Sequence, residues 1–185
     1  FKELNLNSEF KTSLLVMQPI TNQNFNIEKN FNKILKFLEV NNFQQLVVSK
    51  INNDPGSEDM INYFKDLSHK SLEIKLLDTL GLKNYISLAK HVDLVLGNSS
   101  SFIFEFPVKN IKSILLTNRQ AGRELSEQIF ISEINLNSLQ AAYEKLITAK
   151  TKSLGPYYKK NTSKNIARKI FEFSKNNPKF YKEFK

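Results

Sequence analysis

Three consecutive serines, Ser99, Ser100 and Ser101, with Glu105 four residues further on, are the residues of this chain best suited to chemistry. They follow an apolar run at 92–96 and precede the apolar residues 102–104. A polar turn between a buried strand and a helix start offers unpaired N–H groups, the positive end of the helix dipole and serine hydroxyls. This combination favours binding of a phosphate or diphosphate. The plainer alternative is that Ser99 or Ser100 only caps the helix.

A carboxylate and two arginines accompany the serines. Glu105 lies about one turn into the expected helix, where it could accept hydrogen bonds from the vicinal hydroxyls of a ribose, or merely complement the helix dipole. Arg119 and Arg123 lie on either side of Gly122 in the loop after the next strand, and guanidinium groups bind phosphate oxygens well. The alternative for both arginines is surface salt bridging. Taken together, these residues predict a site for a nucleotide diphosphate.

Strand and helix patterns alternate along the chain and would bring these loops together. Short apolar runs predict strands at 13–17, 46–48, 72–76, 93–96, 113–116 and 128–131. Helical spacing predicts helices at 27–40, 57–67, 85–90, 136–147 and 162–174, with a loop at 80–82 and a short helix from the serines to a stop at Pro107. Such alternation implies an α/β fold with a Rossmann-like parallel sheet covered by helices on both faces. The loops that follow the strands then share one edge.

Length and composition narrow the class of protein. The 185 residues, with 41% hydrophobic content, fit one domain, which we place at residues 1–174, followed by a terminal helix extension or tail at 175–185. No apolar run approaches the ~20 residues that a membrane span needs. The absence of cysteine excludes disulfides and fits a cytoplasmic location, and two histidines are too few for a convincing metal site.

The net charge of +9 permits an anionic partner. Much of the positive charge lies in the last third of the chain, in the pattern of a solvated helix face, so no nucleic-acid partner is expected. Neither a G-x-G-x-x-G fingerprint nor a P-loop is present, which argues against NAD, FAD and ordinary ATP hydrolysis.

Several of these loops together resemble the hydrolysing UDP-N-acetylglucosamine 2-epimerases, in particular the branch that serves sialic-acid and capsule biosynthesis. The resemblance lies in residues 80–90 (Leu-Gly-Leu-Lys-Asn-Tyr-Ile-Ser-Leu-Ala-Lys), in the serine turn with Glu105 and Pro107, and in residues 119–124 (Arg-Gln-Ala-Gly-Arg-Glu). Residues 53–57 and 155–163 resemble two further loops of that branch. The match keeps the family's order and covers nearly the whole chain.

The resemblance implies the C-terminal half of a glycosyltransferase-B-type fold, in which a UDP-sugar lies between two Rossmann-like domains. By position, the diphosphate would be held by Ser99, Ser100 and Ser101, and the ribose by Glu105. The resemblance also assigns Arg119 and Arg123 to the phosphate or to a closing loop, and Leu82 and Tyr85 to the neighbourhood of the uracil.

The family reaction eliminates UDP from UDP-N-acetylglucosamine, leaves a 2-acetamidoglucal and hydrates it to N-acetylmannosamine. The resemblance implies no metal or redox cofactor, UDP or a UDP-N-acetylhexosamine as partner, and a homo-oligomer at full length. The family's acid and base carboxylates belong to its N-terminal domain, so these residues alone would bind UDP weakly without turning it over.

Two departures from the family pattern bear on this interpretation. Gln18 stands where the family has histidine, and a glutamine cannot transfer a proton near neutral pH. Phe102 replaces a glycine after the serines, and its side chain would crowd the approach to phosphate. The alternatives are therefore a glycosyltransferase-type domain for another UDP-sugar, or a non-catalytic binding or assembly module.

Overall fold

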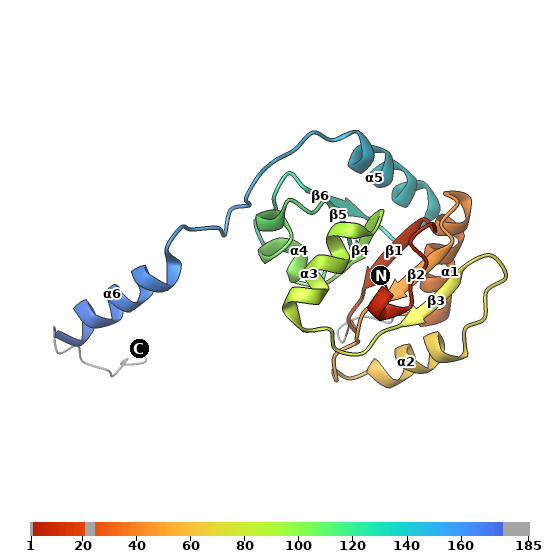
Figure 1. Ribbon diagram of the computed structural model, residues 1–185, viewed down its shortest axis with the longest axis horizontal. Helices are drawn as coiled ribbons and strands as arrows, with labels where there is room; N and C mark the ends of the chain where they lie inside the picture. Colours follow the sequence, from red (N-terminus) through yellow and green to blue (C-terminus); the bar gives the residue numbers. More distant parts are fainter. Residues whose placement is uncertain (1, 21–24, 176–185) are drawn as a thin grey trace.

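The computed structural model describes residues 2–20 and 25–175. At its centre lies a six-stranded sheet with the order β3-β2-β1-β4-β5-β6, in which every neighbouring pair is parallel (Figure 1). The strands are β1 (Thr12–Val16), β2 (Gln45–Val48), β3 (Glu73–Leu76), β4 (Leu94–Gly97), β5 (Ser113–Leu116) and β6 (Ile129–Ser132). The strand order reverses between β1 and β4, and the loops that leave these two strands diverge to form a crevice.

Helices cover both faces of the sheet. One face packs against α1 (Ile27–Val40), α2 (Ser57–Asp66) and α5 (Leu136–Thr148), and the other against α3 (Gly81–His91) and the one-turn α4 (Ser101–Phe104). The 3-10 turns η1 (Lys2–Leu4) and η2 (Pro107–Lys109) complete this body. The predicted α/β class, with a Rossmann-like parallel sheet between two helical layers, is therefore confirmed.

The apolar pattern of the sequence explains the central elements. All five residues of β1 are buried, because helices cover the sheet on both sides. In α1 the side chain of Asn26 accepts a hydrogen bond from the Lys29 amide and fixes the helix start. Phe31, Ile34 and Leu38 follow at helical spacing, and all three are buried against the sheet.

Two predicted boundaries are wrong. Gly81, expected in a loop, is the first residue of α3, where its φ of +69° takes the chain into the helix. The serine helix ends at Phe104, before Pro107, and Pro107 instead begins η2. A proline fits the first position of a helical turn because the N–H that it lacks would have no partner there.

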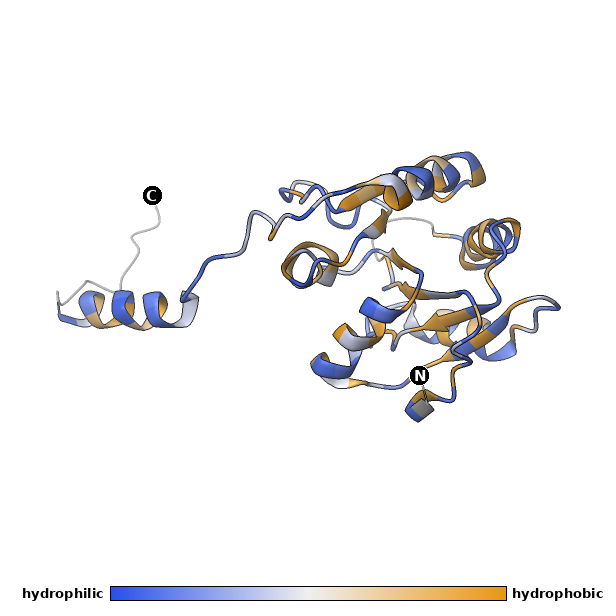
Figure 2. Cartoon of the chain, turned by 45° about the horizontal axis from the view of Figure 1, so that its top comes forward, coloured by the Kyte–Doolittle hydropathy of each residue, from blue (hydrophilic) through white to orange (hydrophobic). Residues whose placement is uncertain are grey.

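Helix α6 (Thr162–Lys175) lies apart from this body at the end of an extended segment (Figure 1). None of its residues is buried, and Figure 2 shows polar and apolar residues interleaved along it. Its exposed apolar side chains include Ile166, Ile170, Phe171 and Phe173. Of the predicted tail at 175–185, only Lys175 belongs to the described residues, and the domain boundary stays a prediction. Among the described helices, none is long and apolar enough to cross a membrane.

Candidate functional site

A hollow of about 370 Å³ lies at the carboxyl edge of the sheet, where the strand order reverses. Its walls come from the ends of β1, β2 and β4, from the loop after β3, and from the first turns of α3. The residues that line it are Val16, Gln18, Ser49, Lys50, Asn52, Asp78, Thr79, Leu80, Gly81, Leu82, Tyr85, Ser99 and Ser101. This is the place at which open α/β sheets bind ligands.

Gly97 allows the serine turn to approach the end of β1. Its φ is +150°, and a Cβ atom there would lie 2.1 Å from the carbonyl oxygen of Val16. Directly after it, the buried side chain of Asn98 accepts a hydrogen bond from the Gln18 amide at 2.7 Å and donates one to the Gln18 carbonyl at 2.9 Å. The two loops that form the crevice are thereby fixed to each other.

The hydroxyls of Tyr85, Ser101 and Ser99 form a hydrogen-bonded chain in the hollow. Tyr85 Oη lies 2.7 Å from Ser101 Oγ, and Ser101 Oγ donates to Ser99 Oγ at 3.0 Å. Since the single proton of Ser101 is used on Ser99, Tyr85 must donate to Ser101. The hydroxyl proton of Ser99 then remains available to a ligand.

Burial keeps Tyr85 in its neutral, donating form. Desolvation is the main reason why the pKa of Tyr85 lies well above its usual value of 10.0. The nearby negative charge of Glu105 adds to this rise in the pKa of Tyr85. The phenol is therefore a donor throughout the neutral pH range.

Glu105 lies beside this chain but does not line the hollow. It occupies the C-cap position of α4, one turn after the first serine of that helix, and its amide bonds to the Ser101 carbonyl at 3.0 Å. Its Oε2 is buried and has no hydrogen-bond partner among the described residues. A buried acceptor without a partner is uncommon in proteins, so this oxygen has unused capacity to accept a hydrogen bond.

The two loop arginines differ in their partners. Arg119 lies 3.9 Å from a carboxylate oxygen of Asp54, whereas Arg123 donates to Gln120 Oε1 at 2.7 Å. Neither arginine lines the hollow. The loop begins at Thr117, whose φ of +66° is unusual for a β-branched residue and directs the chain away from the end of β5.

The structure brings together some of the predicted site residues and not others. Leu82, Tyr85, Ser99 and Ser101 line one hollow. Ser100 does not line it, and although it stands at the N-cap position its side chain makes no capping hydrogen bond. The capping alternative therefore does not hold for Ser100, while Ser99 does accept a hydrogen bond from the Ser101 amide at 3.3 Å.

The expectation that Phe102 crowds the phosphate is wrong. Its side chain is fully buried and packs against the ring of Phe106, with the ring centroids 5.0 Å apart. Since α4 turns Phe102 towards the core, its ring does not separate the hollow from Ser99 and Ser101, which line it.

Gln18, which we predicted to replace a histidine of the family, tethers the loop after β2 to the end of β1. Its Oε1 accepts from the Asn52 amide at 2.7 Å, and its Nε2 lies 3.4 Å from the Lys50 carbonyl. Sequence reasoning missed two further buried residues of this network, Asn98 and Gln120. For Asn98, its position directly before the three serines was the one sequence feature that could have indicated a role in the site.

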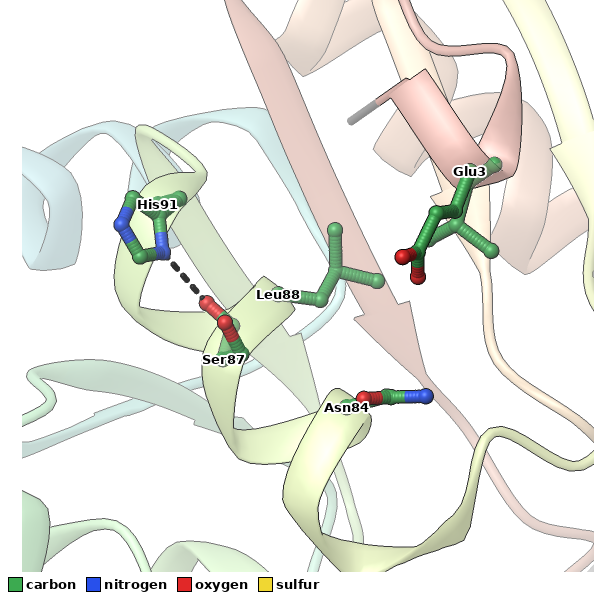
Figure 3. Close-up of a pocket in the computed structure, with 6 residues that line it drawn as sticks. Glu3, Asn84, Ser87, Leu88 and His91 are labelled. Atoms are coloured by element: carbon green, nitrogen blue, oxygen red, sulfur yellow. Dashed lines mark hydrogen bonds between the residues drawn. The ribbon is translucent and has the colours of Figure 1, made fainter.

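A second, smaller hollow of about 200 Å³ lies between η1 and α3 (Figure 3). Glu3 lies across from Asn84 and Leu88 there, and His91 Nδ1 bonds to the Ser87 carbonyl oxygen of its own helix at 2.7 Å. It lies away from the serine turn and the arginine loop, and none of the predicted site residues lines it. We therefore assign the candidate site to the hollow at the carboxyl edge.

Comparison with known proteins gives the family context of this geometry. The family model described as UDP-N-acetylglucosamine 2-epimerase matches residues 2–171. A Campylobacter jejuni protein named GDP/UDP-N,N'-diacetylbacillosamine 2-epimerase (hydrolyzing) is 35% identical over 149 residues, which cover 78% of this chain and 38% of that protein. The Escherichia coli polysialic acid biosynthesis protein P7 is 25% identical over 177 residues, covering 92% of this chain and 45% of the relative. The chain thus spans less than half the length of these relatives.

Solved structures share the fold at low sequence identity. The Methanocaldococcus jannaschii UDP-GlcNAc 2-epimerase, solved in complex with UDP-GlcNAc and UDP, aligns with a TM-score of 0.66 and 19% identity over 88% of this chain and 46% of its own. The Staphylococcus aureus protein MnaA, solved with UDP, aligns with a TM-score of 0.65 and 17% identity over 96% of this chain and 49% of its own.

Proposed function

Because this chain belongs to the UDP-N-acetylglucosamine 2-epimerase family, we propose that the hollow at the carboxyl edge of its sheet binds the UDP moiety of a UDP-N-acetylhexosamine. The observation that carries this proposal is the chain of hydroxyls from Tyr85 through Ser101 to Ser99, which leaves one serine proton for a ligand. It lies at the reversal of the strand order, in a hollow of about 370 Å³. Phosphate oxygens are the acceptors that such a donor suits.

Different residues around the hollow bind the diphosphate, the ribose and the base of the nucleotide. Ser99 donates to the diphosphate, while Ser101 and Tyr85 hold that hydroxyl in place. The unpartnered Oε2 of Glu105 accepts from a ribose hydroxyl, and Leu82, with 66% of its surface exposed, covers the base. The remaining residues on the phosphate side are Ser100, Arg119 and Arg123.

The reaction that we propose for the full-length protein is the hydrolysing 2-epimerisation. The C1–O bond to UDP breaks as a proton leaves C2, and water then adds across the resulting double bond, with hydroxyl at C1 and a proton at C2. In this scheme the described residues bind the departing UDP, and their fixed donors stabilise the negative charge that develops on it. We assign the acid and base of this scheme to the part of the relatives' length that this chain does not span.

One observation favours a second candidate, a binding module without catalysis. Both ends of the Gln18 side chain are engaged with the loop after β2, so this residue serves to hold that loop. A family member that had lost proton transfer at this position would still keep the nucleotide site. Turnover of UDP-N-acetylglucosamine by the full-length protein distinguishes an enzyme from a binding module.

Titration of the chain with UDP, followed by calorimetry, tests the proposed site. We expect UDP to bind, and to bind more tightly than uridine, because the diphosphate supplies the acceptors for Ser99. The variant Ser99→Ala should lose roughly 1.5–3 kcal/mol of UDP binding, the range for a hydrogen bond to a charged group. No heat of binding at millimolar UDP, with the circular dichroism of a folded α/β protein, would refute the site.

Ser126→Ala is the matched control for this titration. Ser126 is a buried serine in the turn before β6 and does not line the hollow. Its replacement should leave UDP affinity unchanged. An equal loss of affinity in both variants would mean that the titration reports general loosening of the fold and not a site at Ser99.

A further inference from the structure

Gln120 connects the serine turn to the arginine loop. Its side chain is only 4% exposed. Its Nε2 donates to the main-chain carbonyl of Asn98 at 2.8 Å, and its Oε1 accepts from Nη1 of Arg123 at 2.7 Å. One amide therefore joins the residue that directly precedes Ser99 to the guanidinium of the neighbouring loop.

A second contact from the same segment holds Arg123. The guanidinium carbon lies 5.2 Å from the ring centroid of Phe104, the last residue of α4, in a cation–π arrangement. The Phe104 ring in turn packs edge-on against Tyr157 at 4.9 Å. Arg123 is thus attached on both sides of the serines, to Asn98 through Gln120 and to Phe104 directly.

The partners of Arg123 leave its charge uncompensated. Gln120 and Phe104 are neutral, and within residues 2–20 and 25–175 no carboxylate lies within ion-pair distance of Arg123. Arg119, on the same loop, shares its charge with Asp54 at 3.9 Å. Of these two arginines, Arg123 is therefore the better placed to attract an anion beside the serine turn.

We propose that Gln120 is a positioning residue, which holds the Arg123 guanidinium beside the serine turn ready for the diphosphate of the nucleotide. The inference rests on the proposed function, because it presupposes that the serine turn faces a diphosphate. A long arginine side chain loses rotamer freedom when it binds an anion. A guanidinium fixed in advance by Gln120 avoids most of that loss at the moment of binding.

The test compares UDP affinity in wild type, Gln120→Met, Arg123→Ala and the double variant. Methionine keeps the length of glutamine but neither donates to Asn98 nor accepts strongly from Arg123. We expect each single change to weaken UDP binding about tenfold, or about 1.4 kcal/mol. The double variant should bind no more weakly than Arg123→Ala alone, because Gln120 acts through Arg123. Uridine, which lacks phosphate, should bind the wild type and Gln120→Met equally.

Gln128→Met is the matched control. Gln128 is another fully buried glutamine, directly before β6, and its Nε2 donates to the Ser153 carbonyl at 2.7 Å. This change should lower the melting temperature without changing UDP affinity. If Gln120→Met does not fold, Gln120→Glu replaces it: a carboxylate keeps the contact to Arg123 but neutralises its charge, so UDP binding should again weaken.

The outcomes separate the positioning role from the proposed function. If the wild type binds UDP and Ser99→Ala weakens it, but Gln120→Met and Gln120→Glu both bind like wild type, the positioning role is wrong and the function stands. Additive losses in the double variant would also overturn it, because Gln120 would then act independently of Arg123. If the wild type does not bind UDP, both proposals fail.

Discussion

Both edges of the sheet contain buried side-chain amides that join neighbouring strands, but at the carboxyl edge these amides hold the serine turn, whose Ser99 and Ser101 line the hollow. At the amino edge, Gln45 accepts from Thr12 Oγ1 at 3.2 Å and donates to Glu73 at 3.2 Å, so it links the first residues of β1, β2 and β3. At the carboxyl edge, Asn98 and Gln120 make equally buried links.

The difference lies in what surrounds the amides and not in the amides themselves. Asn98 directly precedes Ser99, whose proton is free, and Gln120 accepts from Arg123, which has no carboxylate partner among the described residues. The loops diverge at this edge because the strand order reverses there, so polar groups can point into a hollow. A buried polar network thus supports binding where free hydrogen-bond donors lie next to it.

Gly97→Ala tests the tightest point of the carboxyl edge and should have the largest effect. The added Cβ would lie 2.1 Å from the Val16 carbonyl oxygen, which belongs to the backbone and cannot move aside easily. We expect a loss of roughly 3 kcal/mol or more of unfolding free energy in urea, from overpacking together with the unfavourable backbone conformation. Gly122→Ala is the control: φ there is +82° but no atom lies within 4 Å, so the loss should be near 1 kcal/mol. Equal losses in the two variants would contradict the close approach.

Asp93→Ala tests the amino edge. It should lower stability by an intermediate amount and leave UDP affinity unchanged. Asp93 Oδ2 accepts from the Thr12 amide at 2.7 Å and so anchors the start of β1 to the start of β4. Loss of this hydrogen bond should lower the free energy of unfolding by about 1–2 kcal/mol. This is at the low end of the range for a hydrogen bond to a charged group, because the bond is only partly buried. UDP affinity, measured by calorimetry, should not change. A drop in affinity comparable to that of Ser99→Ala would remove the distinction between the two edges.

Tyr85→Phe tests the carboxyl edge through the pH dependence of stability. Near neutral pH it should have the smallest effect on stability of the three changes. Burial raises the pKa of Tyr85 above its usual 10.0, so the neutral phenol stabilises the fold fully below pH 10, and this contribution is lost as the pH rises further. Between pH 10 and 12 the melting temperature of the wild type should therefore fall more steeply than that of Tyr85→Phe. Near pH 7 the variant loses only the hydrogen bond to Ser101, about 1 kcal/mol.

Tyr63→Phe provides the control for the alkaline melts. Burial also raises the pKa of Tyr63, which lies against α1 and away from the hollow. Both variants should flatten the alkaline loss of stability, and only Tyr85→Phe should also change UDP affinity. Parallel wild-type and Tyr85→Phe melts above pH 10 would contradict the burial of the Tyr85 hydroxyl.

Much of the sheet could be predicted from local patterns. Most of the strands are short apolar runs, and the runs at 46–48 and 113–116 fall within one residue of β2 and β5. Helix α1 was equally clear, since its apolar residues repeat at helical spacing. The same pattern predicted α6, yet none of its residues is buried. An amphipathic pattern indicates which face of a helix is apolar, but it does not show whether another element packs against that face.

The site could be predicted only where the signal is local. The serine turn stands out because polar residues there separate a buried strand from a helix. The pairing of Asp54 with Arg119 and that of Gln120 with Asn98 join distant parts of the chain, and no periodicity marks such pairs. The direction of Phe102 depended on the rotation of a one-turn helix, which sequence spacing does not determine.

The junction of β1 with β4 sets a condition on how the hollow can form during folding. The hydrogen bonds between Gln18 and Asn98 join residues 80 positions apart, and the intervening chain includes β2, β3 and three of the helices. Closing a loop of that length costs entropy before any contact compensates for it, and sheets built from such distant pairs form slowly. The hollow is therefore absent from every intermediate that contains only local β-α-β units. Recovery of ligand binding during refolding would therefore report the moment at which β1 and β4 pair and the hollow forms.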